Sequence, residues 1–438
     1  MNDEATGADS VRVSTSSPPP AVVAIPAHDE AERIGACLAA LAMQRDDCGA
    51  PMPAGSFSVL VLANNCRDAT ADLCRAFAAV APFPLHVVEC TLAPGEAHAG
   101  GARRRAMDAA ADLLERGPGR DGVILTTDAD SRAGPTWVSA TLAAFAQGAD
   151  AVAAYIDADP NEYLALGAGF LARGRLEDRH LSRVAELYAA LDPRSHDPWP
   201  NHRVHSGAGI AVTLAAYRAV GGLPIRPLGE DNALAQVLDE AGFLIRHSTE
   251  AFVTTSCRFD SRAPGGAGDT MRARHEDLDA PCDGDLERAK SLFRRVRTRG
   301  ILRRLHAAGR LGDTAGWRHR LGLDRDAAAA LALACADRPF SHLWRRVEAE
   351  CPALHIGEPL RPSALPREIE AVERLLRRLE RLGVSAEAAG TRFPPSEAGR
   401  GEPAISFTPF SPQRTEDPAG IPVRAEPPTN GIAAPPRR

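Results

Sequence analysis

The stretch Val123-Ile-Leu-Thr-Thr-Asp128-Ala-Asp130-Ser-Arg132 decides the fold. Its apolar first half predicts a buried parallel strand, because such strands are apolar on both faces. Asp128 and Asp130 come directly after it, and residues two apart on an extended chain point the same way. We therefore expect both carboxylates to face one crevice at the carboxyl end of the strand, where open α/β sheets bind ligands.

Two carboxylates that face one point repel one another unless a cation lies between them. Carboxylate oxygens suit Mg²⁺ or Mn²⁺, which proteins hold with one or two carboxylates and with phosphates of the substrate. Asp128 and Asp130 are therefore candidate metal ligands. The alternative is a solvated, Asp-rich turn that caps a helix.

The composition is that of a globular protein with a sizeable core. The chain has 438 residues, of which 44% are hydrophobic and 25% charged, with a net charge of −6. This charge argues against a partner such as nucleic acid. The nine cysteines form no CxxC pair, which indicates reduced thiols in a cytoplasmic protein. No stretch approaches the ~20 apolar residues of a membrane span.

The chain divides into four parts by composition. Residues 1–20 and 391–438 are Pro-rich and weakly apolar, and we expect both to be disordered. Residues 21–265 alternate short apolar runs with helical patterns, which predicts an α/β domain with a mostly parallel sheet. Residues 266–390 are helical and partly basic.

Two features of the helical part concern partners. Residues 288–320 carry many arginines, which could touch anionic lipid at a membrane surface. A solvated face or an oligomer contact is the alternative. The segment 367–382 has one apolar stripe, which packs on its own domain or binds a partner or membrane.

Polar residues also follow the first two predicted strands. Residues 21–25 lead into Pro26-Ala-His28-Asp29-Glu30, and residues 57–62 lead into Asn64-Asn65. These loops are candidates for contacting a nucleotide. The alternatives are structural: Asp29 is a possible helix N-cap, and one Asn can satisfy backbone groups at a turn.

Four further stretches are candidates for a functional role. The cluster Arg103 to Arg105 follows a glycine-containing loop and can grip phosphate oxygens, or it forms a solvated helix face. The small residues of 205–209 let the backbone approach a ligand closely. Glu230 and Asp231 lie at a helix start, where Asp231 is a candidate base or an N-cap. The segment 258–269 is Gly- and Arg-rich and is a lid candidate.

Taken in order, these motifs resemble the family 2 glycosyltransferases of the GT-A fold over residues 21–260. The resemblance rests on five motifs: residues 25–30, residues 64–70, Asp128-Ala-Asp130, Gly221-Gly222 and Glu230-Asp231. It implies a nucleotide-binding αβα sandwich that transfers a sugar from a nucleoside diphosphate sugar.

The resemblance also implies roles for single residues. Asp128 and Asp130 match the metal motif for Mg²⁺ or Mn²⁺, and Asp231 matches the base of inverting members, supported by Glu230. The matches to donor-binding positions are Pro26, His28, Glu30, Asn64, Asn65, Arg103 and Asp128. Family members usually carry an Asp where this chain has Asn64-Asn65, so the nucleobase stays open.

Several alternatives stay open beside this interpretation. A retaining transferase on the same fold is one, and a catalytically inactive sugar-nucleotide-binding module is another. A sugar nucleotidyltransferase would need a Gly-rich phosphate loop where Pro26 to Glu30 stand. The acceptor is a small molecule, a glycan or a lipid. His247 and His275 are candidates for a third metal ligand, although a structural histidine is the simpler interpretation.

Overall fold

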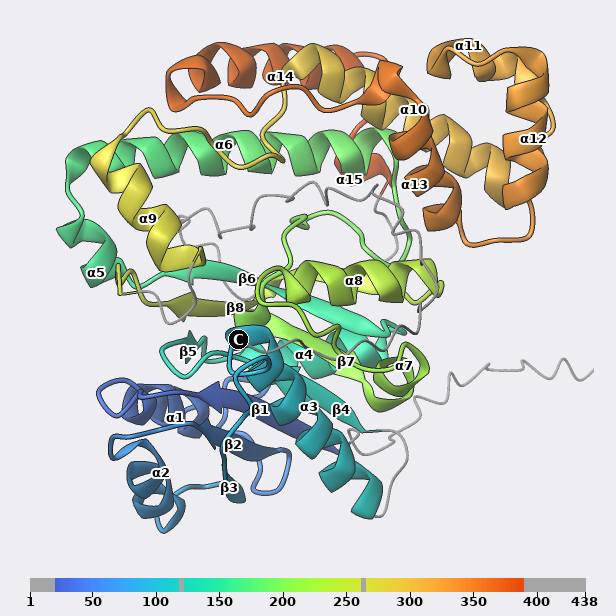
Figure 1. The fold of residues 1–438 in the computed structure, drawn as a ribbon. Coiled ribbons are helices and arrows are strands. Elements are labelled where there is room, and N and C mark those ends of the chain that lie inside the picture. The colour runs from blue at the N-terminus through green and yellow to red at the C-terminus, as the bar shows by residue number, and fades with distance from the viewer. Residues whose placement is uncertain (1–19, 118–121, 261–264, 390–438) are drawn as a thin grey trace, which may run out of the picture.

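The computed structural model describes residues 20–117, 122–260 and 265–389 (Figure 1). The expected disordered ends, residues 1–20 and 391–438, lie outside this range apart from Pro20. Part of the lid candidate, residues 261–264, lies outside it as well.

A mixed eight-stranded sheet forms the centre, with strand order β3-β2-β1-β4-β7-β6-β8-β5. Four of the seven strand pairs are parallel, which confirms a mostly parallel sheet. The strands are β1 (Ala21–Ala27), β2 (Ser58–Asn64), β3 (Leu85–Cys90), β4 (Val123–Thr126), β5 (Arg132–Ala133), β6 (Ala151–Ala158), β7 (Ile210–Thr213) and β8 (Ile245–Thr255).

Strand direction brings the polar motifs to one edge. Strands β1, β2 and β4 run parallel, so the residues that follow them meet at their common carboxyl edge. Strand β7 runs antiparallel to β4, with Thr126 opposite Ile210, so the start of β7 lies at this edge. Strand β6 pairs antiparallel with β7 and parallel with β8, so β8 also ends there.

Helices cover both faces of the sheet, as an αβα sandwich requires. One core contains apolar residues of α1 (Ile34–Ala42), α2 (Thr70–Ala78) and α4 (Trp137–Ala146) against the sheet. The core on the other face contains those of α3 (Ala99–Arg116), α7 (Leu214–Ala219) and α8 (Glu230–Glu240). Strand residues alternate between the two cores: Val23 belongs to the first and Val22 to the second.

A helical layer lies beyond α8 (Figure 1). Its centre is the long helix α6, which shares a core with α10 and α14. The buried stripe of α14, Ile369, Val372 and Leu376, confirms that this amphipathic helix packs on its own chain. The helices are α5 (Pro160–Ala165), α6 (Ala168–Leu191), α9 (Ala267–Glu276), α10 (Ala289–Ala307), α11 (Arg318–Leu321), α12 (Arg325–Cys335), α13 (Phe340–Glu350), α14 (Leu365–Glu380) and α15 (Ala386–Ala389).

One strand differs from the pattern in the sequence. The apolar runs at 243–247 and 251–255 indicate two strands, but β8 is a single strand over Ile245–Thr255. Its register against β6 shifts between Ala154 and Tyr155, which face Ser248 and Phe252. The extra residues of this bulge include the polar residues that separate the two apolar runs in the sequence.

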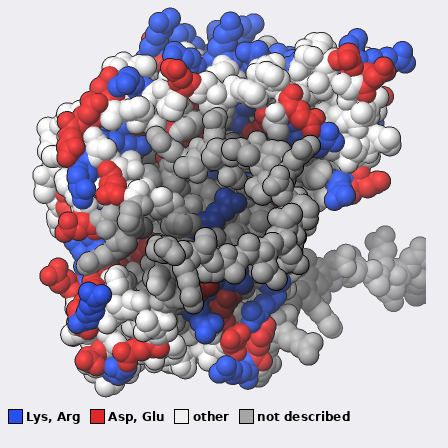
Figure 2. All heavy atoms as spheres, in the orientation of Figure 1, with Lys and Arg blue, Asp and Glu red and all other residues white. Residues whose placement is uncertain are grey.

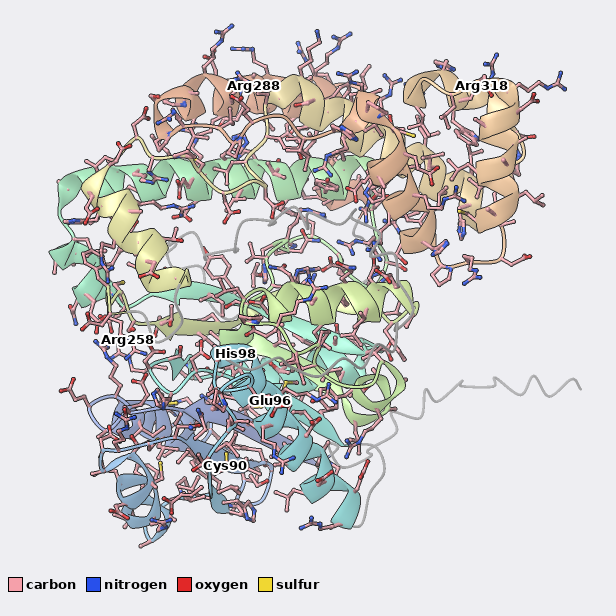
Figure 3. All side chains as sticks on the ribbon, in the orientation of Figure 1. Cys90, Glu96, His98, Arg258, Arg288 and Arg318 are labelled. Atoms are coloured by element: carbon pink, nitrogen blue, oxygen red, sulfur yellow. The ribbon has the colours of Figure 1, made fainter. Side chains whose placement is uncertain are left out.

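The outer surface of the helical layer is rich in basic side chains. Figure 2 shows Lys and Arg along this side of the molecule, and Figure 3 places Arg288 and Arg318 there. Exposed positions of α10 include Lys290, Arg294 and Arg297. Within the described residues, the helices are too short or too polar to cross a membrane. All nine cysteines lie in the described residues, and none of them forms a disulfide.

Candidate active site

The acidic motif after β4 lies where its strand predicts. Asp128 is partly exposed and Asp130 is more buried, with side chains 33% and 13% accessible. Arg103 donates from Nη2 to Oδ1 of Asp128 at 2.8 Å, and Ser256 donates to Oδ2 of Asp130 at 2.8 Å. Arg258 also contacts Oδ2 of Asp130, at 3.0 Å.

Glu30 joins the same acidic group. Its Oε2 accepts a hydrogen bond of 3.0 Å from Arg258, which therefore lies between Glu30 and Asp130. Figure 3 shows Arg258 beside the sheet on the side of α1. Burial raises the pKa of Asp130 to about 6, and Asp128 and Glu30 add to this rise while Arg258 opposes it. Arg258 belongs to the lid candidate, but no pattern in the sequence predicts this contact.

Arg103 connects the two acidic motifs. Its Nε donates to Oε1 of Glu230 at 3.1 Å, while Nη2 binds Asp128. Its Nη1 donates to the carbonyl of Gly207 at 2.6 Å. The side chain is only 6% accessible, so the structure places Arg103 inside the site as a bridge between carboxylates. The adjacent Arg104 binds Asp108 on the same helix at 2.7 Å.

The glycine at position 207 makes room for this bridge. A Cβ on Gly207 would lie 2.3 Å from Cζ of Arg103, which is closer than any non-bonded contact allows. The small residues expected to face a ligand instead face Arg103 at this position. Sequence reasoning missed this, because only the fold brings α3 against the start of β7.

Asp231 lies at the start of α8, whose N-cap residue is Gly229. Its Oδ2 accepts from the backbone N–H of Gly207 at 3.1 Å, and its Oδ1 accepts from that of Asn232 at 2.7 Å. Asp231 is therefore not the N-cap that the pattern allowed. Burial and the neighbouring Glu230 raise the pKa of Asp231 to about 6, against hydrogen bonds from Asn232 and Gly207 that lower it.

The loops after β1 and β2 are joined by hydrogen bonds. Nδ1 of His28 lies 2.9 Å from the carbonyl oxygen of Asn64, and Pro26, the last residue but one of β1, pairs with Leu62. Asp29 has a left-handed backbone (φ 51°) and accepts from the N–H of Arg67, so it does not cap α1. The loops thus form one surface at the carboxyl edge.

The two asparagines differ in their environment. Asn65 accepts from the N–H of Leu92 at 3.1 Å and donates to its carbonyl at 3.3 Å, which holds the end of β3. Asn64 is buried, and its Oδ1 lacks a hydrogen-bond partner among the described residues. An unpaired buried oxygen is costly, so Asn64 offers an acceptor that a ligand could use.

The carboxylate oxygens of Asp128 and Asp130 suit a divalent cation. Asp128 and Asp130 each use one carboxylate oxygen for the bonds above, and the other oxygen has no hydrogen bond among the described residues. Hard oxygens of this kind suit Mg²⁺ or Mn²⁺. The two histidines considered as third ligands lie elsewhere: His247 binds Asp197, and His275 packs against Phe259.

Comparison with known proteins adds a family. Residues 22–168 match the family model described as glycosyl transferase family 2. The matched segment contains the loops after β1 and β2, Arg103 and the Asp128-Asp130 motif, and it ends before Glu230 and Asp231. Curated protein sequences include no match to this chain.

Solved structures give weak likenesses to the whole chain. One is the mannosyltransferase PcManGT from Pyrobaculum calidifontis, with GDP-Man and Mn²⁺ (TM-score 0.37, 16% identity, 84% of this chain and 76% of that one). Another is S. aureus TarS 1–349 with UDP-GlcNAc (TM-score 0.38, 15% identity, 90% of this chain and 100% of that one). Scores this low carry no weight in the assignment.

The family match places residues 22–168 among the glycosyltransferases, and the αβα sandwich agrees with the GT-A fold that the resemblance implies.

Proposed function

We propose that this glycosyltransferase moves a sugar from a nucleoside diphosphate sugar to an acceptor hydroxyl with inversion, and that Asp231 is the base. The bridge formed by Arg103 is the observation that supports this most. It brings Asp128 of the metal motif and Glu230 of the base motif to neighbouring N–H groups of one guanidinium. Donor chemistry and acceptor chemistry therefore share one crevice.

The donor nucleotide would bind along the carboxyl edge of β1 and β2. His28 and Glu30, with Pro26 at the end of the strand, flank this surface. Asn64 would accept a hydrogen bond from the base through its unpaired Oδ1. Asn65 would act by holding the loop after β3.

Asp128 and Asp130 would hold Mg²⁺ or Mn²⁺ beside the diphosphate. A bound divalent cation neutralises the charge that develops on a leaving diphosphate. Arg258 would leave the acidic group, or move toward the phosphates, when the cation and donor bind. Arg258, which pairs with Glu30 and Asp130, supplies the positive charge that the cation would replace.

Asp231 would take the proton of the acceptor hydroxyl during an oxocarbenium-like displacement. A general base works best when its pKa lies near the working pH, and burial raises the pKa of Asp231 to about 6. Two backbone amides fix both carboxylate oxygens. Glu230 would hold Arg103 and thereby keep the donor and base motifs together.

The remaining assignments follow from the same proposal. Residues 21–265 would be the catalytic domain and residues 266–390 a helical region, and the nine free thiols favour a cytoplasmic protein. The acceptor is a small molecule, a glycan or a lipid met at a membrane surface.

Thermal shifts with UDP, GDP, CDP and dTDP sugars, with and without Mn²⁺, test the donor site. A ligand that binds the native state raises its melting temperature. We expect a Mn²⁺-dependent rise with sugars of one nucleotide, and loss of the Mn²⁺ dependence in Asp130→Ala. Asp326→Ala, at an exposed acid on α12, is the control. A rise that does not depend on Mn²⁺ would remove the metal assignment, and no rise at all would favour an inactive module.

A further inference from the structure

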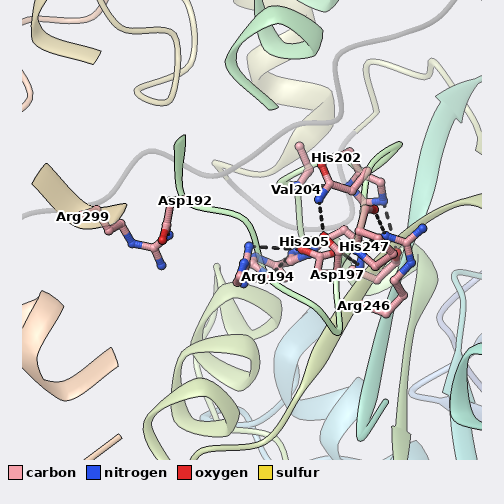
Figure 4. A network of polar contacts seen from close by, with 12 residues as sticks. Asp192, Arg194, Asp197, His202, Val204, His205, Arg246, His247 and Arg299 are labelled. Atoms are coloured by element: carbon pink, nitrogen blue, oxygen red, sulfur yellow. Dashed lines mark hydrogen bonds and ion pairs between the residues drawn. The ribbon is translucent and has the colours of Figure 1, made fainter. Parts of the chain in front are cut away.

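Buried polar side chains form a chain of contacts beside β8, in which Figure 4 labels Asp197, His247 and His205. Asp197 lies on the segment between α6 and β7, and its side chain is fully buried. Its Oδ2 is 2.8 Å from Nδ1 of His247, and Nε2 of His247 is 3.0 Å from Nε2 of His205. His205 in turn forms a side-chain hydrogen bond with Asn232.

These contacts fix the proton on each ring. Asp197 is ionised, since Arg194 and Arg246 both pair with it, so Nδ1 of His247 must donate to it. Burial lowers the pKa of His247 and lowers that of His205 to about 4, so both rings are neutral at pH 7. Nε2 of His247 is then an acceptor, and Nε2 of His205 must donate to it. Nδ1 of His205 then carries no hydrogen.

The end of the chain holds the two segments that bind Asp231. His205 is two residues before Gly207, whose N–H binds Oδ2 of Asp231. Asn232 directly follows Asp231, and its N–H binds Oδ1. The hydrogen bond between His205 and Asn232 therefore joins the two backbone segments that fix the carboxylate.

We propose that Asp197, His247 and His205 form a positioning chain, which sets the tautomer of His205 and through Asn232 holds Asp231 in place. The inference rests on the proposed role of Asp231 as the base. These residues do not touch the reacting atoms: they act through the start of α8. The negative charge of Asp197 fixes both tautomers. It requires hydrogen on Nδ1 of His247, and this in turn requires hydrogen on Nε2 of His205.

Asp197→Asn makes a specific test, because the structure predicts how the new amide is oriented. Oδ1 of Asp197 accepts from the N–H of His247 at 2.9 Å and from Arg246 at 3.2 Å, so the oxygen of Asn stays there. The NH₂ group then takes the place of Oδ2, where it donates to Nδ1 of His247 and no longer pairs with Arg194. Both rings must exchange tautomers.

The measurement is ¹⁵N NMR of protein with labelled histidine at pH 7. In the wild type we expect His247 to carry hydrogen on Nδ1 and His205 on Nε2, and in Asp197→Asn we expect both to be reversed. Asp192→Asn is the matched control: Asp192 is an equally buried acid of the same segment that pairs with Arg299 and Arg303. It should leave both tautomers unchanged. Wild-type tautomers other than these, or no reversal at His205, would overturn the chain.

Turnover tests whether the chain positions the base. With the donor found by thermal shift and water as acceptor, we expect Asp197→Asn to lower kcat at least tenfold, with donor affinity within twofold and Asp192→Asn within threefold of wild type. If Asp197→Asn does not fold, His205→Phe serves in its place. Unchanged kcat beside reversed tautomers would overturn the positioning role. If the wild type turns over no donor, the proposed function fails, while the tautomers still report on the chain.

Discussion

At the scale of single residues, Asp231 combines burial with fixed hydrogen bonds. Burial and Glu230 raise its pKa to about 6, from an ordinary value of 3.8. The folded protein therefore binds this proton more tightly than the unfolded chain does. Such a group favours folding at low pH, and its contribution is lost as the pH rises from about 4 to about 6. The raised pKa of Asp231 therefore lowers the stability of the folded protein at neutral pH, and it brings the pKa of the proposed base closer to neutral.

Asp231→Asn should remove part of this pH dependence. Two pKa units correspond to about 3 kcal/mol, an upper limit for one buried carboxyl. Between pH 4 and pH 7 we expect the stability of the wild type to fall relative to that of the variant, by about 1–3 kcal/mol. Urea unfolding at several pH values measures this. Asp130, whose pKa is also raised to about 6, acts in the same sense in both proteins, while His205 and His247, whose pKa values burial lowers, act in the opposite sense in both. Parallel curves for wild type and variant would contradict the assignment.

Arg258→Gln should tighten the binding of Mn²⁺. The guanidinium lies between Glu30 and Asp130 and competes with any cation for these carboxylates. Without it, we expect the Kd for Mn²⁺ from calorimetry in the absence of donor to fall about threefold to tenfold, because about 1 kcal/mol of competition is removed.

Arg33→Gln provides the control for that measurement. Arg33 pairs with Glu162 at 2.7 Å and has no ion pair with Glu30 or Asp130 among the described residues. It should change the affinity for Mn²⁺ little. Equal affinities in Arg258→Gln and wild type would show that Arg258 does not compete with the cation.

At the scale of elements, the site is built from strand ends, and this part could be predicted from the sequence. The apolar run before Asp128 and the runs before His28 and Asn64 indicate strands, and β4, β1 and β2 end near those residues. Asp130 therefore lies where its spacing predicts. These positions can be predicted because each polar motif closely follows its own strand in the sequence.

Contacts between distant elements could not be predicted in this way. Arg103 could be expected to grip phosphate, yet it binds Asp128 and Glu230, which lie 25 and 127 residues away in the chain. Arg258 and Gly207 enter the site only because β8 ends, and β7 begins, at the same edge. The order of strands in the sheet, which the sequence pattern does not state, decides these contacts.

Gly207→Ala tests the contact between α3 and the start of β7. The new Cβ would meet Cζ of Arg103 at 2.3 Å, so either the guanidinium or the backbone must shift. We expect a loss of stability of about 1–3 kcal/mol, as for other overpacked sites, and a loss of turnover of at least tenfold. Gly35→Ala, on α1 with open space around its Cβ, is the control. A variant with normal turnover would show that Arg103 is not needed where it lies.

At the scale of the whole molecule, the helical layer and the sheet share the segment from α6 to β7. Helix α6 packs against α10 and α14, and the chain after it carries Asp197, His205 and Gly207 to the site. Asp192 at the end of α6 pairs with Arg299 and Arg303 of α10. The layer therefore supports the segment that positions Asp231.

Leu187→Ala in α6 should weaken this support. The side chain is fully buried between α10 and α14, and such truncations cost about 2–5 kcal/mol. We expect urea unfolding to show a loss of this size. Leu333→Ala on α12, where Leu333 is 83% exposed, should cost less than about 0.5 kcal/mol. A similar small loss in both variants would show that the contact between α6 and the helical layer adds little.

The central claim is that Asp231 is the base of a sugar transfer, and release of nucleoside diphosphate tests it most directly. The wild type and Asp231→Asn are compared with the donor that raises the melting temperature, in the presence of Mn²⁺. We expect the wild type to release nucleoside diphosphate. The variant should bind the donor with similar affinity, but it should release nucleoside diphosphate about a thousandfold or more slowly. Equal rates in both proteins would contradict the account.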